Sequence, residues 1–224
     1  MIKLTQITKS FGGPGAEIEV LKDLSMQVHA GDTVSILGPS GSGKSTLLNI
    51  LGTLEKPTSG EFTFKGRNML DLSEKELVHY RSRELGFVFQ DHQLLPQLTL
   101  WENILLPVLA LKKSAMSQNV QERAEKLLKR VDLYHRIHHR PEQLSGGEKQ
   151  RIAVVRALIN NPSILLADEP TGSLDAGNST QLGDLLVDLN KEEGTAMVLV
   201  THSTELASRF MEQYLLDDGR LKPL

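Results

Sequence analysis

The sequence predicts an α/β fold with a mainly parallel β-sheet, and two apolar runs are the first reason for this prediction. Residues 164–167 and 196–200 are almost continuously apolar, which is typical of parallel strands that are covered on both faces. Between them, residues 178–192 have the amphipathic pattern of a crossover helix. A strand, a helix and a second strand in this order predict a parallel sheet with helices packed on it.

A change of pattern along the chain is the second reason, and it predicts how the chain is divided. Strand patterns dominate up to residue 89, helical patterns with polar and proline breaks follow, and strand patterns return near residue 163. We therefore expect a single domain over 1–224. Its core covers about 1–89 and 161–224 and includes a small antiparallel β subdomain. An α-helical subdomain is inserted at about 91–160.

The individual elements follow from local patterns. Alternating or continuously apolar runs predict strands at 2–8, 20–28, 32–37, 60–66 and 85–90. Apolar residues at helical spacing predict helices at 73–83, 99–111, 118–132 and 146–160. Ser73 and Glu76 form a capping box at the start of the first of these helices. Glycine and proline predict a turn at 11–15.

Composition excludes several classes of function. The net charge is −3 and the isoelectric point is about 6.2, so no basic surface points to nucleic acid. The chain contains no cysteine, which fits a reducing compartment. The longest apolar run, 104–111, is interrupted by Pro107 and is far shorter than the ~20 residues that span a bilayer. We expect a soluble chain whose membrane role, if any, depends on a partner.

The most informative short stretch is 38–46, which reads G-P-S-G-S-G-K-S-T and matches the phosphate-binding P-loop, G-x-x-x-x-G-K-[ST]. A predicted strand precedes it and a helical pattern follows it, which is the context that this motif requires. The glycines let backbone N–H groups approach phosphate oxygens, and the following helix directs its positive end at them. We predict that a nucleoside triphosphate binds here, to Gly38, Ser40, Gly41, Ser42, Gly43, Lys44, Ser45 and Thr46.

Particular side chains have separate roles in this prediction. Lys44 adds a full positive charge at the β- and γ-phosphates, and the Ser45 hydroxyl is a ligand for Mg²⁺. Two carboxylates, Asp168 and Glu169, end the apolar strand at 164–167. We expect Asp168 to hold Mg²⁺ together with Ser45. Glu169 is expected to orient or deprotonate the attacking water.

A second anion-binding helix start is predicted at Ser145-Gly146-Gly147, within the helical insertion. Ser145 is a good helix cap, and the two glycines leave the first N–H groups accessible. Because one triphosphate already has its binding loop, a second phosphate-binding helix end suggests that each nucleotide is shared between two chains.

The stretch 144–151, L-S-G-G-E-K-Q-R, resembles the signature motif of ATP-binding cassette (ABC) ATPases, and the resemblance covers nearly the whole chain. It implies a P-loop NTPase core of the RecA-like type. It also implies a head-to-tail homodimer that sandwiches two ATP molecules between P-loop and signature, and transport through transmembrane partners. By the same resemblance Phe11 stacks on adenine and residues 172–175 form the D-loop. Gln90 contacts Mg²⁺ and His202 contacts the γ-phosphate.

A finer resemblance concerns 166–172, 85–90 and 94–96, which are similar to the subfamily that serves lipoprotein release and macrolide or peptide export. It implies a permease partner and a peripheral position on the cytoplasmic face of the inner membrane. Ser173 departs from the usual Asn, which weakens assignment to one member of the subfamily. A coupling helix of the permease is expected near Gln90 to Trp101.

Within that segment we expect Leu98 and Trp101 to be internal and Leu94 and Leu95 to lie nearer the groove for the coupling helix. His135, His138 and His139 could suggest a metal site. They lie in a polar, arginine-containing segment without an acid or cysteine, so we interpret them as a solvated loop.

Two other classes share the motifs. Soluble ABC ATPases of translation or DNA repair carry two cassettes or a long coiled-coil insert, whereas this chain has one P-loop and no heptad run. A regulatory ABC ATPase of the cell-division type signals through a membrane partner without transport, and the motifs do not separate it from a transporter. The cargo is not encoded here, because the permease recognises it.

Overall fold

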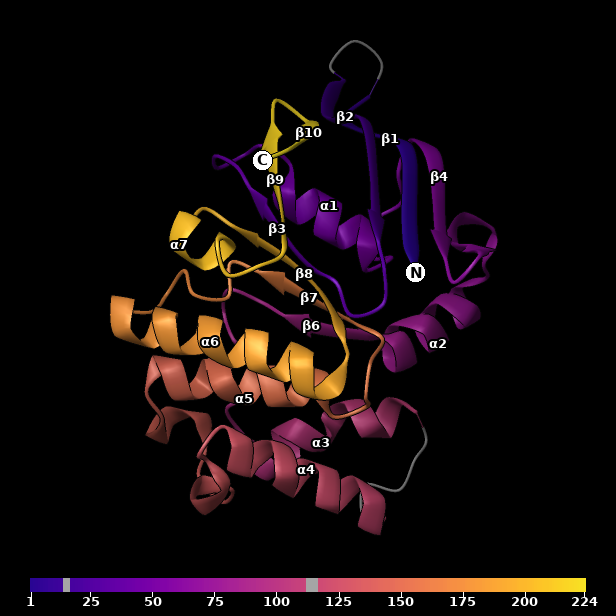
Figure 1. The fold of residues 1–224 in the computed structure, drawn as a ribbon. Helices are drawn as coiled ribbons and strands as arrows, with labels where there is room; N and C mark the ends of the chain where they lie inside the picture. The colour runs from indigo at the N-terminus through magenta and orange to yellow at the C-terminus, as the bar shows by residue number, and fades with distance from the viewer. Residues whose placement is uncertain (14–16, 112–116) are drawn as a thin grey trace.

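The computed structural model describes residues 1–13, 17–111 and 117–224. Two sheets and a layer of helices form the molecule, with the larger sheet in the middle (Figure 1). The expected α/β fold with a parallel sheet, a small antiparallel sheet and additional helices is confirmed. The turn predicted at 11–15 lies partly outside the described residues.

The central sheet has six strands in the order β10-β9-β3-β8-β7-β6. Its strands are β3 (Thr33–Leu37), β6 (Leu85–Val88), β7 (Ile164–Asp168), β8 (Ala196–Thr201), β9 (Glu212–Asp217) and β10 (Arg220–Pro223). Neighbours from β9 to β6 are parallel, and β10 is antiparallel to β9. Because the strands are parallel, the carboxyl ends of β3, β7 and β8 meet at one edge of the sheet.

Burial on both faces explains the continuous apolar runs. In β8 every residue is buried. Met197 and Leu199 belong to the core on one face, whereas Val198 and Val200 belong to the core on the other. Two hydrophobic cores thus share this sheet, one with the helical insertion and one with the antiparallel sheet and α1 (Lys44–Leu51).

The antiparallel sheet has the order β2-β1-β4-β5. It consists of β1 (Ile2–Phe11), β2 (Ile18–Val28), β4 (Ser59–Phe64) and β5 (Arg67–Asn68). Buried and exposed residues roughly alternate in β2 and β4, as expected for strands with one face on the core. Figure 1 shows α1 between this sheet and the central one, so the helix after the P-loop is enclosed on both sides.

The remaining helices are α2 (Glu74–Glu84), α3 (Leu100–Ala110), α4 (Gln118–Arg130), α5 (Gly146–Leu158), α6 (Ala176–Glu193) and the short α7 (Thr204–Ala207). Single 3₁₀ turns occur at Met69–Asp71, Tyr134–Arg136 and Pro141–Gln143. Figure 1 shows α5 and α6 on the face of the central sheet opposite α1, with α3 and α4 beyond them. Within the described ranges, no helix combines the length and the apolar character needed to cross a bilayer.

Most predicted elements are present within a few residues of their expected ends, and the capping box of Ser73 and Glu76 is formed. The strand predicted at 85–90 ends at Val88, and the one predicted at 60–66 ends at Phe64. The pattern gave no prediction of α7, β9 or β10. In β9 five of the six residues are half-buried or exposed, which masks the apolar signal of a parallel strand.

Candidate nucleotide site

The P-loop connects the end of β3 to the start of α1. Lys44 is the first residue of α1, and Gly43 before it adopts a left-handed conformation with φ of 103°. A Cβ on Gly43 would lie 2.8 Å from Leu21 Cδ2, and one on Gly38 would lie 2.3 Å from the Leu216 carbonyl oxygen. Glycine is therefore required at both positions, because the loop is pressed against β2 and β9.

Lys44 is directed back into its own loop. Its Nζ donates hydrogen bonds to the Gly38 carbonyl at 2.9 Å and to the Pro39 carbonyl at 3.0 Å. The side chain is largely buried, and its Nζ is also 3.8 Å from Glu169 Oε1. Ser42 Oγ is buried and forms no hydrogen bond with any described residue. A buried cation beside an unsatisfied hydroxyl fits a loop built for phosphate oxygens.

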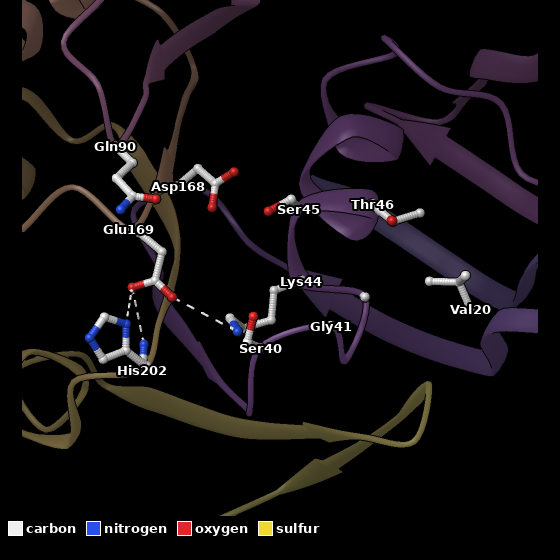
Figure 2. A pocket seen from close by; sticks show the side chains of 11 residues that line it. Val20, Ser40, Gly41, Lys44, Ser45, Thr46, Gln90, Asp168, Glu169 and His202 are labelled. Atoms are coloured by element: carbon white, nitrogen blue, oxygen red, sulfur yellow. Dashed lines mark hydrogen bonds and ion pairs between the residues drawn. The ribbon is translucent and has the colours of Figure 1, made fainter. Parts of the chain in front are cut away.

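The two carboxylates at the end of β7 point in different directions (Figure 2). Glu169 Oε2 accepts a hydrogen bond from the backbone N–H of His202 at 3.1 Å and lies 2.9 Å from His202 Nδ1. Its other oxygen faces Lys44. Glu169 thus links the P-loop to the segment after β8, where an acid could accept a proton from a bound water.

Asp168 faces Ser45 at the first turn of α1 (Figure 2). Burial raises the pKa of Asp168 above its ordinary value, and the nearby Glu169 charge acts in the same direction. A hydrogen bond from Ser45 and the charge of Lys44 oppose this shift. A desolvated carboxylate next to a hydroxyl is an oxygen donor pair that suits a hard cation.

These side chains surround one cavity of about 440 Å³. It is lined by Val20, Ser40, Gly41, Gly43, Lys44, Ser45, Thr46, Gln90, Asp168, Glu169 and His202. The structure therefore brings together residues from four separate stretches that the sequence marked. Val20 of β2 is an addition, because its sequence pattern indicated only a strand.

Other predicted residues lie elsewhere. Gly38 and Ser42 belong to the P-loop but are not among the residues that line the cavity; Gly38 packs against Leu216, and Ser42 is buried. Phe11, at the end of β1, is 42% exposed, and its ring has Lys9 Nζ 4.6 Å from its centre. It does not line the cavity within the described part of the chain.

The signature segment is also outside the cavity, at the start of α5. Ser145 caps this helix as expected, and Glu148 completes a capping box with it. Gly147 is packed against α6, because a Cβ there would lie only 2.4 Å from Asn178 Oδ1. Asn178 bonds in turn to Asp175, the cap of α6. The sequence patterns did not indicate this contact.

The segment after Gln90 corrects one expectation. Leu94 is 6% exposed and belongs to a hydrophobic core, so it is not part of a groove. Leu95 is 45% exposed, as expected, and Leu98 is half-buried. Trp101 is half-buried and packs against the same core. The two consecutive leucines therefore differ in environment, with Leu94 in the core and Leu95 at the surface.

The comparisons with known proteins agree with this geometry. Residues 21–172 match the model of the family described as "ABC transporter". The chain belongs to the ABC transporter family. It is 47% identical to the "Lipoprotein-releasing system ATP-binding protein LolD 2" of Rhodospirillum rubrum, over 99% of this chain and 95% of that protein.

Solved structures of the ABC transporter family lead to the same assignment. A "Dimeric Structure of MJ0796, a Bacterial ABC Transporter Cassette" superposes with a TM-score of 0.89 at 43% identity, covering 99% of this chain and 97% of that one. A "post-hydrolysis state" of the same cassette, "bound to ADP and Pi", has a TM-score of 0.89 at 42% identity, covering 100% and 99%. This chain is thus an ATP-binding, ATP-hydrolysing subunit of an ABC transporter.

Proposed function

We propose that two copies of this chain hydrolyse ATP at two shared sites and power a permease of the lipoprotein-releasing type. The observation that carries the proposal is the separation described above. Lys44, Glu169 and His202 surround the cavity, whereas the signature helix start lies outside it in the same chain. A second chain placed head to tail would bring its own signature to this cavity.

On the P-loop side, the backbone N–H groups and Lys44 hold the phosphates of ATP. Glu169 accepts a proton from the water that attacks the γ-phosphorus, and ADP leaves as the bond to the bridging oxygen breaks. His202 contacts the γ-phosphate and holds Glu169 in place. Glu169 pairs with His202 and lies near Lys44 Nζ, which keeps the acid and the lysine at the same end of the cavity.

Mg²⁺ fits the neighbouring oxygen donors. The Ser45 hydroxyl faces the Asp168 carboxylate (Figure 2), and Gln90 lines the same cavity. Mg²⁺ prefers oxygen ligands and is usually held by one or two carboxylates together with substrate phosphates. When bound, it neutralises charge on the phosphates. We assign Ser45, Gln90 and Asp168 to this role.

The signature half serves the partner chain. Ser145, Gly146 and Gly147 present the N-terminus of α5, whose N–H groups and positive dipole end suit the γ-phosphate of the other chain's ATP. Phe11 stacks on adenine, since its exposed ring lies at the end of β1 beyond the cavity. In the domain division predicted from sequence, the P-loop belongs to the core and the signature segment to the inserted helical subdomain.

The partner is inferred from the relatives. A 47% identical protein of matching length is named for lipoprotein release, so we assign this chain to the cytoplasmic face of the inner membrane, beside a lipoprotein-releasing permease. The exposed Leu95 follows the cavity residue Gln90 by five positions. An apolar contact there would connect a coupling helix of the permease to the nucleotide site.

Reconstitution with a lipoprotein-releasing permease from the same organism tests the assignment. The wild-type complex should release a lipoprotein from proteoliposomes when ATP is added, and the permease should stimulate ATP hydrolysis. Leu95→Glu should abolish the stimulation and leave basal hydrolysis unchanged. Met211→Glu, at an exposed methionine beside α7, is the matched control and should behave as wild type.

Two results would count against the assignment. Full stimulation of the Leu95→Glu variant would exclude the docking contact. Stimulated hydrolysis without any release of lipoprotein would favour a regulatory ATPase of the cell-division type.

A further inference from the structure

The segment that carries Gln90 from β6 into the cavity is irregular, and its backbone is held almost entirely by side chains. We call residues 89–99 the Gln90 loop. It contains neither helix nor strand, and Gln93 within it has a positive φ of 51°. Irregular backbone with a left-handed non-glycine residue persists only where neighbouring groups hold it.

Two residues of α5 hold the first part of the Gln90 loop. Gln150 Nε2 donates to the Phe89 carbonyl at 2.8 Å. Arg156 donates to the Gln93 carbonyl at 2.5 Å and to the His92 carbonyl at 2.8 Å. The two donors thus bracket Gln90, one on the residue before it and one on residues that follow it.

A third side chain, from α3, holds the end of the loop. Asn103 is fully buried, and its amide nitrogen donates to the carbonyls of Leu95, Leu98 and Thr99. Its oxygen accepts from the Leu95 backbone N–H at 2.8 Å. Asn103 therefore holds the part of the loop from Leu95 to Thr99. The part that contains Gln90 is held by Gln150 and Arg156.

Arg156 is a partly buried cation that binds only backbone carbonyls, which is unusual for a residue with a purely structural role. Burial lowers the pKa of its guanidinium, although arginine keeps its charge in proteins. Among the described residues no carboxylate forms a salt bridge with Arg156, and its guanidinium donates its hydrogen bonds to carbonyls of the Gln90 loop. A partly desolvated cation without a counter-ion is costly, so its placement favours a functional reason.

We propose that Gln150 and Arg156 are positioning residues that hold Gln90 in the nucleotide cavity and tie it to the signature helix. Both lie on α5, whose first turn is the signature segment. One rigid helix therefore sets the place of Gln90 at this chain's ATP and the place of Ser145 and Gly147 at the partner's ATP. This second consequence rests on the dimer proposed above, whereas the first concerns this chain alone.

Hydrogen exchange and ATPase kinetics on Arg156→Met test the proposal, because methionine keeps the aliphatic volume and removes the donors. We expect amides of the Gln90 loop to exchange faster and kcat to fall about 10-fold, as for a modest displacement of a positioned group. The KM for ATP should stay within about twofold, because the P-loop is untouched. Arg156→Lys, which keeps one donor group, should recover part of the loss.

Arg123→Met is the matched control. Arg123 also donates to backbone carbonyls of the α5 end, those of Leu158 and Ile159, and it pairs with Glu193. It does not touch the Gln90 loop. We expect this variant to unfold at a lower temperature while the exchange of the Gln90 loop and kcat stay as in wild type.

A double-mutant cycle with Gln90→Ala separates positioning from general destabilisation. If Arg156 acts through Gln90, Arg156→Met should reduce kcat little further when Gln90 is already alanine. Additive losses, or unchanged exchange of the loop in Arg156→Met, would overturn the proposal. If the wild-type chain hydrolysed no ATP, the proposed function would fail. Hydrogen exchange of the Gln90 loop amides would still test whether Arg156 holds the loop.

Discussion

The proposed ATP site has two parts, the P-loop half with Lys44, Glu169 and His202, and the signature half at Ser145–Gly147. They differ in how completely a single chain forms them. In the P-loop half, groups of opposite charge from the start of α1 and from the ends of β7 and β8 converge on one cavity, where Lys44 Nζ lies 3.8 Å from Glu169 Oε1. In the signature half, Ser145 and Glu148 each donate a backbone hydrogen bond to the other's side chain, and Gly147 packs tightly against Asn178. The residues of the first half line the cavity, whereas Ser145, Gly146 and Gly147 of the second are not among its lining residues. The difference supports the proposal that the second half works on a ligand held by another chain.

The largest expected effect comes from removing the acid of the P-loop half. Glu169→Gln keeps the shape of the side chain but removes its ability to accept a proton, so kcat should fall by about 10³-fold. ATP affinity, measured by titration with a fluorescent ATP analogue, should be preserved. Glu205→Gln, at an exposed acid on α7, serves as the control and should keep wild-type turnover. Wild-type turnover in Glu169→Gln would contradict the assigned base.

A smaller effect is expected in the signature half. Gly147→Ala would push a methyl group to 2.4 Å from Asn178 Oδ1, so the helix start must shift and kcat should fall about 10- to 100-fold. ATP affinity of the single chain should not change. Gly177→Ala meets no atom closer than 3.5 Å and is the control.

Asn178→Ala sharpens this prediction, because it removes the oxygen that the new methyl group would meet. The double variant Gly147→Ala/Asn178→Ala should therefore be more active than Gly147→Ala alone. Equal turnover of the two would show that the clash at α6 is not the cause of the loss.

The smallest effect concerns the contact between α4 and α6, which lies outside both halves. Glu193 is nearly buried and pairs with Arg123 at 2.8 Å and with Lys126 at 3.2 Å. Burial raises its pKa, but the hydrogen bonds and charges of Arg123 and Lys126 together hold it below the ordinary value of about 4.5. Glu193→Gln should lower the free energy of unfolding by about 1–2 kcal/mol at neutral pH.

The lowered pKa sets the pH dependence of this contribution. An acid with a depressed pKa in the folded state stabilises above its ordinary pKa and loses that contribution as pH falls through the folded value. The difference between wild type and Glu193→Gln, measured by urea unfolding, should therefore shrink below about pH 4.5. Glu192→Gln removes a more exposed partner of Arg130 and should cost about 0.5 kcal/mol or less.

The sequence was a good guide to one half of the site and a poor guide to its supports. Residues 38–46 form one continuous stretch, and the acids 168 and 169 are neighbours at the end of an apolar run, so local sequence chemistry is enough to identify both. Val20 in the cavity, Asn178 against Gly147 and Arg156 on the Gln90 loop depend on contacts between distant segments. No local pattern encodes such contacts, because each of these residues is ordinary in its own helix or strand.

The same reason explains the errors in the fold. β9 lies beside β3 in the parallel sheet, but only one of its residues is buried. Its place is fixed by backbone pairing with a strand far away in sequence. Leu94 was expected near a groove because it is apolar and follows Gln90, yet Asn103 and Arg156 turn the loop so that Leu94 enters the core.

The central claim is that the halves of two chains complete each other, and ATP retention by mixed variants tests it most directly. Both variants carry Glu169→Gln to prevent turnover. One adds Lys44→Ala, which removes the P-loop half, and the other adds Gly147→Asp, which removes the signature half. Only a mixed dimer contains an intact pair. The account predicts that the mixture forms dimers and retains labelled ATP, whereas neither variant does so alone. A mixture that retains no more ATP than its components would contradict it.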